Sequence, residues 1–393
     1  MPSPLSRSTT LDLRRLLCPA MGLLLSAPAW AHGPSPAIIG VAAAGEGGPQ
    51  VLQLSAGLAT RGPDGWTWLC GAAWGGPPSP LAASSDGATT FVAAADGLRA
   101  ITGTSVSEPV LPDVNAATAL VLDAGAHVWA LTRQGGATRL WRVGTSAPVW
   151  ESPDGTWTGF ALHDGHPVVG RVAADGLHVL TIAVDGAEVG EATLPASPGA
   201  TVTLRSAGAL YAVLRTGSTS ELARVDASLV SLATDKGAIH GPVLAGGSAV
   251  VVIGGELRTI SGDETVPWDA ARTYTCLARA GGEAFACAQK ELFAVADAVT
   301  GPVVTLATLL PPPEALVPEA QRESCQSQWS HFASEAGVPP DPGTDDATAA
   351  APTGDEGCAA STGGATRWAA LLGLLVVRRR RRGAPRMDEQ IRG

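Results

Sequence analysis

A pair of turn-forming residues recurs about every 40 residues through the middle of the chain. Successive pairs are 39, 38, 40, 43, 39 and 35 residues apart. The seven pairs are Gly47-Gly48, Asp86-Gly87, Ala124-Gly125, Asp164-Gly165, Ala207-Gly208, Gly246-Gly247 and Gly281-Gly282. A fixed period of this length, with turn signals in every unit, is typical of radial repeats such as propellers.

Each unit divides into about four short runs rich in Val, Leu, Ala and Trp, bounded by Gly, Asp or Ser turns. Runs of this length and composition indicate β-strands. The sequence therefore predicts an all-β, seven-bladed β-propeller over residues 37–310, with six blades as the alternative. A sandwich is disfavoured because it gives no fixed period. We expect the first run, Ile38 to Val41, to close the ring against the last blade.

Some turns have a recognisable composition. Gly65-Trp-Thr-Trp-Leu-Cys70 is followed by Ser85-Asp-Gly-Ala-Thr-Thr-Phe-Val, and Ser152-Pro-Asp-Gly-Thr-Trp157 forms a shortened motif. This texture resembles secreted propellers with BNR or Asp-box blades, in the style of photosystem assembly-factor propellers. The resemblance implies a structural hairpin element, and it does not by itself imply sialidase activity.

The composition and pattern of the sequence change after Leu310. Three prolines end the last strand, and the segment from Pro318 to Ala333 predicts one helix with a proline near its start. Cys325 and Trp329 lie four residues apart on one face of that helix, so both can dock on the propeller. We expect residues 311–336 to form this helical extension. Residues 337–357, rich in Pro, Asp, Thr and Ala, predict a disordered acidic linker.

The amino-terminal residues 1–31 have the order of a signal peptide. Arg7, Arg14 and Arg15 precede a mostly apolar stretch, and Ala29-Trp30-Ala31 is a small-x-small cleavage site. The mature chain is expected to begin at His32, after cleavage at Ala31. A buried amino-terminal helix is the alternative.

Residues 358–382 form a second address signal. Cys358 is followed by small residues, an apolar run that ends at Val377, and five arginines, Arg378, Arg379, Arg380, Arg381 and Arg382. The order resembles the myxobacterial carboxy-terminal sorting tail (MYXO-CTERM), which implies surface display and processing near Cys358. A hydrophobic membrane helix with a cytoplasmic arginine stop accounts for the same pattern. The chain departs from the tail family at Arg367 and by the basic-polar extension 383–393. A basic solvated terminus is the alternative.

Charge excludes one class of partner. The chain has 26 basic and 36 acidic residues. The first 31 residues hold three basic and one acidic, and the last 36 hold eight basic and two acidic, which leaves a net charge of −18 for residues 32–357. Nucleic-acid binding needs a basic surface, so we expect no nucleic-acid partner. An acidic exported domain of this kind is expected to be a monomer.

The cysteines also indicate export. Apart from Cys18 and Cys358, the chain has four, an even number that suits an oxidising compartment. Cys276 and Cys287 lie eleven residues apart on what read as adjacent strands, so we favour this pair among the three possible pairings. The remaining pair would be Cys70 with Cys325. No C-x₂₋₄-C spacing supports a zinc site.

Catalytic signals are weak. His163-Asp-Gly-His166 could meet a metal, but Asp-Gly is a common hairpin turn and no third ligand follows. A sialidase-type site would need clustered arginines beside Tyr211 or Tyr274, and nothing in the spacing of the arginines gathers them. The nucleophile-elbow, Walker A, HExxH and EF-hand motifs are missing from the sequence. Eight tryptophans between Trp66 and Trp268 could stack sugars, but packing between blades is the better interpretation.

The sequence therefore predicts a non-enzymatic binding module, exported and held at the cell surface or outer membrane, with no cofactor and no metal. The membrane is a partner through the tail, and the ligand is an unknown protein or glycan. Retention in the periplasm is the alternative location. A secreted propeller hydrolase or lyase acting on glycans and a structural envelope component are the alternative functions.

Overall fold

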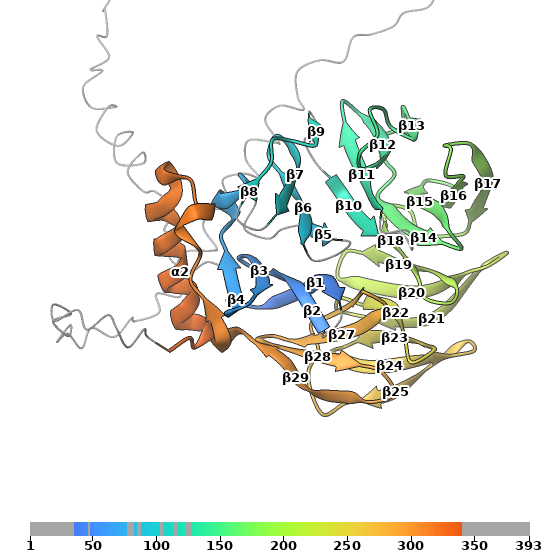
Figure 1. Ribbon diagram of the computed structural model, residues 1–393. Helices are drawn as coiled ribbons and strands as arrows, with labels where there is room; N and C mark the ends of the chain where they lie inside the picture. The colour runs from blue at the N-terminus through green and yellow to red at the C-terminus, as the bar shows by residue number, and fades with distance from the viewer. Residues whose placement is uncertain are drawn as a thin grey trace, which may run out of the picture. The chain divides into compact units, whose positions relative to one another are not determined.

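The computed structural model describes residues 35–339 except 46–47, 77–81, 85–87, 103–104, 113–116 and 123–126. These residues belong to one compact unit of the chain, which ends at Pro339. Seven antiparallel sheets are arranged in a ring (Figure 1). The protein is therefore a seven-bladed β-propeller, as the repeat predicted.

Each blade takes its strands in sequence order. Blades 1 to 3 contain β1 (Ile38–Gly45), β2 (Gly48–Leu54), β3 (Gly57–Gly62) and β4 (Gly65–Leu69); β5 (Ala82–Ser84), β6 (Thr89–Ala94), β7 (Gly97–Thr102), β8 (Ser105–Val106) and β9 (Leu111–Pro112); and β10 (Ala117–Leu122), β11 (Val128–Gln134), β12 (Ala137–Arg142) and β13 (Trp150–Ser152).

Blades 4 to 7 have four strands each. They contain β14 (Gly159–His163), β15 (His166–Ala173), β16 (Gly176–Ile182) and β17 (Glu188–Leu194); β18 (Thr201–Ser206), β19 (Leu210–Thr216), β20 (Thr219–Val225) and β21 (Leu229–Asp235); β22 (His240–Ala245), β23 (Ser248–Ile253), β24 (Glu256–Ser261) and β25 (Glu264–Asp269); and β26 (Cys276–Ala280), β27 (Glu283–Ala288), β28 (Glu291–Val295) and β29 (Val299–Thr305).

The recurring turn pair has the same position wherever the structure describes it. It lies in the hairpin between the first and second strands of a blade, as Asp164-Gly165 does between β14 and β15. Asp164 and Gly165 have φ angles of 50° and 80°. A two-residue hairpin with two positive φ angles is the type I′ turn, which suits Asp-Gly and Gly-Gly pairs. The period in the sequence is therefore the period of this hairpin.

Apolar side chains between neighbouring blades form the core. Val202 and Leu204 on β18 pack with Leu177 and Val179 of the preceding blade. Leu204 and Leu177 are fully buried, and burying one such side chain contributes roughly 1.5–3 kcal/mol. Six of the eight tryptophans considered for sugar stacking are also buried, Trp68 among them against α2: Trp66, Trp68, Trp74, Trp129, Trp150 and Trp157. Their burial agrees with a packing role.

Strand β1 closes the ring against the last blade, as expected: it lies beside β26, and the backbone N–H of Ile38 donates to the carbonyl of Gln289 at 2.8 Å. Its own sheet partner is β2. A second closure was not expected: the chain leaves blade 7 and adds a short strand, β30 (Leu309–Leu310), to blade 1. Strand β30 pairs in parallel with β4. Burial of Leu306 and Leu309 in the core of blade 1 stabilises this crossing.

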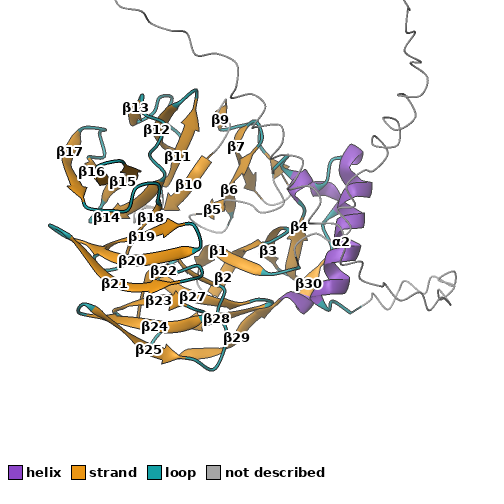
Figure 2. Cartoon of the chain, turned by 180° about the vertical axis from the view of Figure 1, so that it is seen from behind, coloured by secondary structure: helices purple, strands orange, loops and turns teal. Residues whose placement is uncertain are grey.

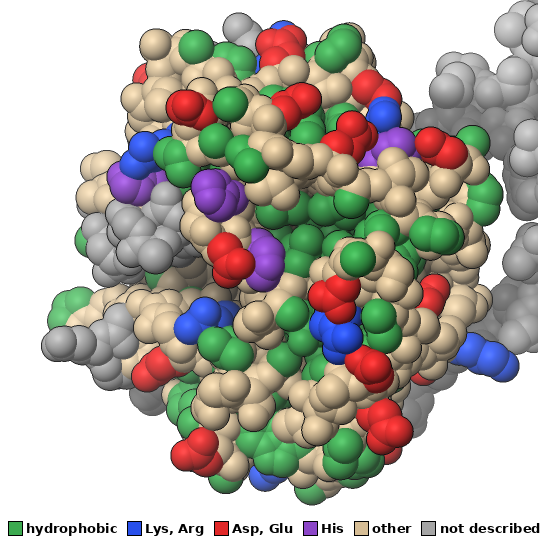
Figure 3. All heavy atoms as spheres, turned by 90° about the vertical axis from the view of Figure 1, so that its right-hand side faces the viewer, with side chains coloured by type: hydrophobic (Ala, Val, Ile, Leu, Met, Phe, Trp, Pro, Cys, Tyr) green, Lys and Arg blue, Asp and Glu red, His purple; other side chains and the backbone are tan. Residues whose placement is uncertain are grey.

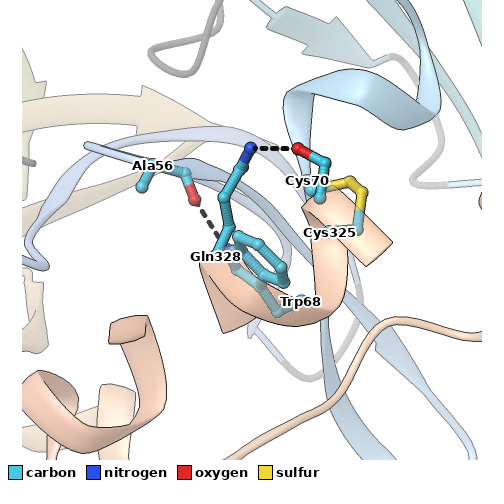
Figure 4. The surroundings of a disulfide bond; sticks show 6 residues. Ala56, Trp68, Cys70, Cys325 and Gln328 are labelled. Carbon is cyan, nitrogen blue, oxygen red and sulfur yellow. Dashed lines mark hydrogen bonds between the residues drawn. A yellow bond between two sulfur atoms is a disulfide. The ribbon is translucent and has the colours of Figure 1, made fainter. Parts of the chain in front are cut away.

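The helix α2 (Arg322–Ala336) then packs on blade 1 (Figure 2). The ring of Trp68 lies 5.6 Å from that of Trp329 and 5.4 Å from that of Phe332, measured between centroids. Cys325 is bonded to Cys70, and Figure 4 shows this bond beside Trp68. We call residues 306–338, which run from blade 7 across blade 1, the clasp.

The helix begins later than the sequence predicted. Pro318 has φ −51° and ψ 139°, an extended conformation, and a 3₁₀ turn at Glu319–Gln321 separates it from α2. Two further 3₁₀ turns, Leu306–Thr308 and Glu314–Leu316, shape the clasp, and Gly71–Ala73 forms another after β4. Gly337, with φ 84°, ends α2 because it adopts the left-handed conformation.

None of the helices in the described part of the chain has the length and apolar character needed to cross a membrane.

Candidate functional site

The first strand of every blade lies beside the first strand of the next blade, so these strands line the ring axis. We call β1, β5, β10, β14, β18, β22 and β26 the inner wall. Among the inner-wall residues whose exposure is described, only five side chains are exposed: Ile39, Thr201, Thr203, Arg205 and Arg279. Three of the five lie on β18. This concentration makes β18 the candidate site.

The alternation of β18 explains its two faces. Val202 and Leu204 point into the core shared with blade 4, so Thr201, Thr203 and Arg205 lie on the opposite face. Arg205 and Thr203 lie on the same side of the sheet as their cross-strand partners Tyr211 and Val213, which pack toward blade 6. We call Thr201, Thr203 and Arg205 the polar row. Because the strand rises about 3.3 Å per residue, its members are spaced by roughly 6.6 Å.

Arg205 has no counter-ion among the described residues. Its one hydrogen bond runs from Nη1 to the backbone carbonyl of Leu204 at 3.1 Å. Burial lowers the pKa of Arg205, although the side chain is still exposed to solvent. Both observations fit a guanidinium that is crowded by protein but open on one side. An arginine keeps its charge in proteins, so the row carries an uncompensated positive charge.

His240, on the inner wall of blade 6, responds to that charge. Burial lowers the pKa of His240, and the positive charge of Arg205 lowers it further. The imidazole is therefore neutral near pH 7, and it can both donate and accept a hydrogen bond. The field of Arg205 extends from blade 5 to blade 6.

At the end of the row, blades 4 and 5 are joined by a side-chain hydrogen bond. His163 Nδ1 lies 3.0 Å from the hydroxyl of Ser206. His163 and His166 face each other across the type I′ hairpin, with Asp164 Oδ2 at 3.6 Å from His163 Nε2. The part of the chain that the structure describes holds no group of three His, Cys, Asp or Glu side chains placed to bind a metal ion.

Most of the arginines weighed for a sialidase-type site lie apart from both tyrosines. Arg139 pairs with Glu151, Arg171 with Asp154, and Arg142 contacts His127. Tyr274 donates to Asp269 at 2.6 Å. In blade 5, however, Arg205 and Arg224 are the cross-strand partners of Tyr211 on its two sides. Arg224 pairs with Asp226 and Asp263, so the described residues bring two arginines to Tyr211 and leave one of them without a carboxylate.

The Ser152–Trp157 motif forms a compact turn. Asp154 Oδ1 accepts from the backbone N–H and the hydroxyl of Thr156, at 3.2 Å and 2.7 Å. The guanidinium of Arg171 lies 4.8 Å from the ring centroid of Trp157. This turn connects β13 to β14, and so it lies between two blades, not within the hairpin of one blade.

Other parts of the described surface offer less. A shallow recess of only about 20 Å³ lies within the clasp, lined by Pro312, Glu314, Val317, Arg322, Cys325 and Gln326. Small-molecule sites usually exceed about 300 Å³. One face of the molecule shows acidic side chains scattered over it, not gathered into one patch (Figure 3).

Both disulfides have the pairing that the sequence favoured. Cys276 and Cys287 lie opposite each other on β26 and β27. Cys70 and Cys325 join the end of β4 to α2. The processing and sorting residues, Ala31, His32, Cys358 and Arg378 to Arg382, lie outside the described residues, as do the extension 383–393 and most of the linker.

Sequence reasoning missed the polar row, although a signal for it existed. The phase of the repeat places the strand before each turn pair on the inner wall. Before Ala207-Gly208 that strand reads Thr-Val-Thr-Leu-Arg-Ser, with polar and apolar residues alternating. This alternation marks Thr201, Thr203 and Arg205 as one face.

Comparisons with known proteins assign the chain to no family. No protein-family model matches the chain, and no curated protein matches it. Crystal structures of AztD from Citrobacter koseri (12% identity, 65% of this chain, 92% of that chain, TM-score 0.39) and of the Myceliophteria thermophila Cps50 (Swd1) β-propeller domain (14%, 56%, 85%, 0.38) are similar. So is a Bacteroides caccae protein of unknown function (11%, 60%, 98%, 0.38). Identities and TM-scores this low carry no argument about function.

Proposed function

We propose that this protein is an exported propeller, displayed at the cell surface, that binds a ligand at its inner wall without transforming it. The observation that carries the binding part is the polar row on β18. It is the one stretch of the described inner wall where exposed polar side chains follow one another at every second residue. Ligand sites in closed β-structures commonly lie at such inner surfaces.

Export is supported by the two disulfides and by the order of the two chain ends. Disulfides persist in oxidising compartments and are rare in the cytosol. The signal-peptide pattern of residues 1–31 and the Cys358-to-Arg382 tail point the same way. In this proposal, the tail holds the propeller at the membrane and processing occurs near Cys358.

Location is tested by the intact mass of the protein from the membrane fraction of the producing cell. A species that begins at His32 and ends near Cys358 with added mass supports surface display. A species that retains Arg378 to Arg382 supports a membrane-anchored periplasmic protein and overturns processing at the cysteine.

The binding role is tested with the full-length protein and a panel of envelope polysaccharide fragments. Calorimetry measures binding, and mass spectrometry of the same samples measures whether the ligand is altered. Saturable binding with the ligand recovered unchanged supports the proposal. Ligand cleavage with turnover would establish the hydrolase or lyase alternative, and a complete lack of binding to glycans and envelope proteins would leave the structural role.

A further inference from the structure

Arg205 differs from six other arginines of the propeller because no described carboxylate pairs with it. Six others each have a carboxylate within ion-pair distance: Arg99, Arg139, Arg171, Arg224, Arg258 and Arg272. Arg205 has no such partner among the described residues, and its side chain is exposed on the inner wall beside Thr201 and Thr203. Its positive charge is therefore accessible to an anion from solvent.

The neighbours of Arg205 favour an anion with hydroxyl groups. Thr201 and Thr203 present their hydroxyls on the same face at every second residue, and each hydroxyl can donate and accept. The guanidinium is a planar fork that matches a carboxylate in two parallel hydrogen bonds.

We propose that the polar row binds an acidic sugar, with Arg205 on the carboxylate and Thr201 and Thr203 on the ring hydroxyls. This inference rests on the proposed binding function, because it names the ligand class of that same site. An acidic peptide could also pair with Arg205 and bond the threonine hydroxyls through its backbone, so preference for a peptide is an outcome of the test that refutes the sugar.

The test uses a galacturonic acid trisaccharide and its neutral methyl ester, titrated calorimetrically into the full-length protein. The two probes differ in charge but keep the same hydroxyls. We expect the acid to bind at least tenfold more tightly than the ester. A glutamate tripeptide and acetate serve as further probes.

The decisive variant is Arg205→Gln, and its matched control is Arg279→Gln. Arg279 lies on β26 in blade 7, two blades from the polar row, is exposed, and donates to the carbonyl of Gly282 at 3.4 Å. Both changes alter net charge equally, so a general field effect would weaken both alike. Losing a two-point charged hydrogen bond weakens binding by roughly 10- to 100-fold. We expect that loss in R205Q and less than twofold in R279Q.

Two further measurements separate binding from folding. Because Arg205 has no described counter-ion, R205Q should melt at or above the temperature of the wild type. Arg205→Lys keeps the charge but loses the fork, and its affinity should fall between those of wild type and R205Q. A marked fall in the melting temperature of R205Q would assign the guanidinium a structural role and overturn the inference.

The remaining outcomes are equally decisive. Equal losses in R205Q and R279Q, equal affinity for acid and ester, or preference for the glutamate peptide would each refute an acidic-sugar site. If no acidic sugar binds but a neutral glycan or an envelope protein does, this inference fails and the proposed function stands. If nothing binds, both fail.

Discussion

The bond between Cys70 and Cys325 should contribute far more to stability than the bond between Cys276 and Cys287. The two bonds span 255 and 11 residues. In the chain-entropy description, a cross-link stabilises by restricting the unfolded chain, and the effect grows with the logarithm of the loop. It gives about 5.5 kcal/mol for the long loop and about 2.8 kcal/mol for the short one at 25 °C.

Comparing two double-alanine variants isolates this difference. All four cysteines are nearly or fully buried, so the packing lost with each sulfur is similar in C70A/C325A and C276A/C287A. We expect the free energies of unfolding to differ by about 2.7 kcal/mol, with C70A/C325A the less stable. Urea unfolding followed by tryptophan fluorescence measures both, and matching slopes against urea confirm that the extent of unfolding is the same.

One result would contradict the loop-closure argument. If C276A/C287A is destabilised as much as C70A/C325A or more, loop closure does not govern these bonds. The contacts of the clasp would then hold blade 1 and the last blade together without the covalent link.

Three further changes test particular contacts. His178 lies between two carboxylates, and its hydrogen bond to Asp175 raises the pKa of the imidazole above 6.5. The protonated imidazole stabilises the fold fully below pH 6.5, and this stabilisation is lost as pH rises through the raised pKa. The variant H178Q should therefore flatten the fall in unfolding free energy between pH 6 and 8. Burial and the bond to Asp269 raise the pKa of Tyr274 to about 12, and Y274F should cost about 1 kcal/mol in urea unfolding and raise the pKa of Asp269 in an NMR titration. Trp329 stacks on Phe332 of the same helix and contacts the tilted ring of Trp68 beneath it, so W329A should cost about 2 kcal/mol in thermal or urea unfolding. An unchanged stability in any of the three variants would show that its contact does not stabilise the protein.

The ring was predictable because its signal is local. The turn pairs that the structure describes lie in the same hairpin of successive blades, and in Asp164-Gly165 and Gly246-Gly247 both φ angles are positive, which restricts the residues that fit. Repeating the hairpin repeats the blade, and counting the pairs counts the blades. The pairing of Cys276 with Cys287 was local as well, since both lie in one hairpin.

The clasp and the polar row depend on contacts distant in sequence. Nothing near Leu309 shows that it will pair with Trp66, because that register arises only when the ring has formed. The start of α2 was misplaced because Pro318 suits both a first helical turn and the extended conformation that it adopts. The sequence contains Arg205, but it does not show whether a carboxylate from the same or a neighbouring blade lies within ion-pair distance.

The Cys70–Cys325 bond also decides how the protein bears a mechanical load. Strands β1 to β4 precede Cys70, whereas blades 2 to 7 lie between the two cysteines. Those six blades are thus enclosed in a covalent loop. Tension applied between residues 35 and 339 travels through blade 1, crosses the sulfur bridge and leaves along α2. While the bridge is intact, such a pull can extend only the chain outside the loop, and six of the seven blades are shielded from it.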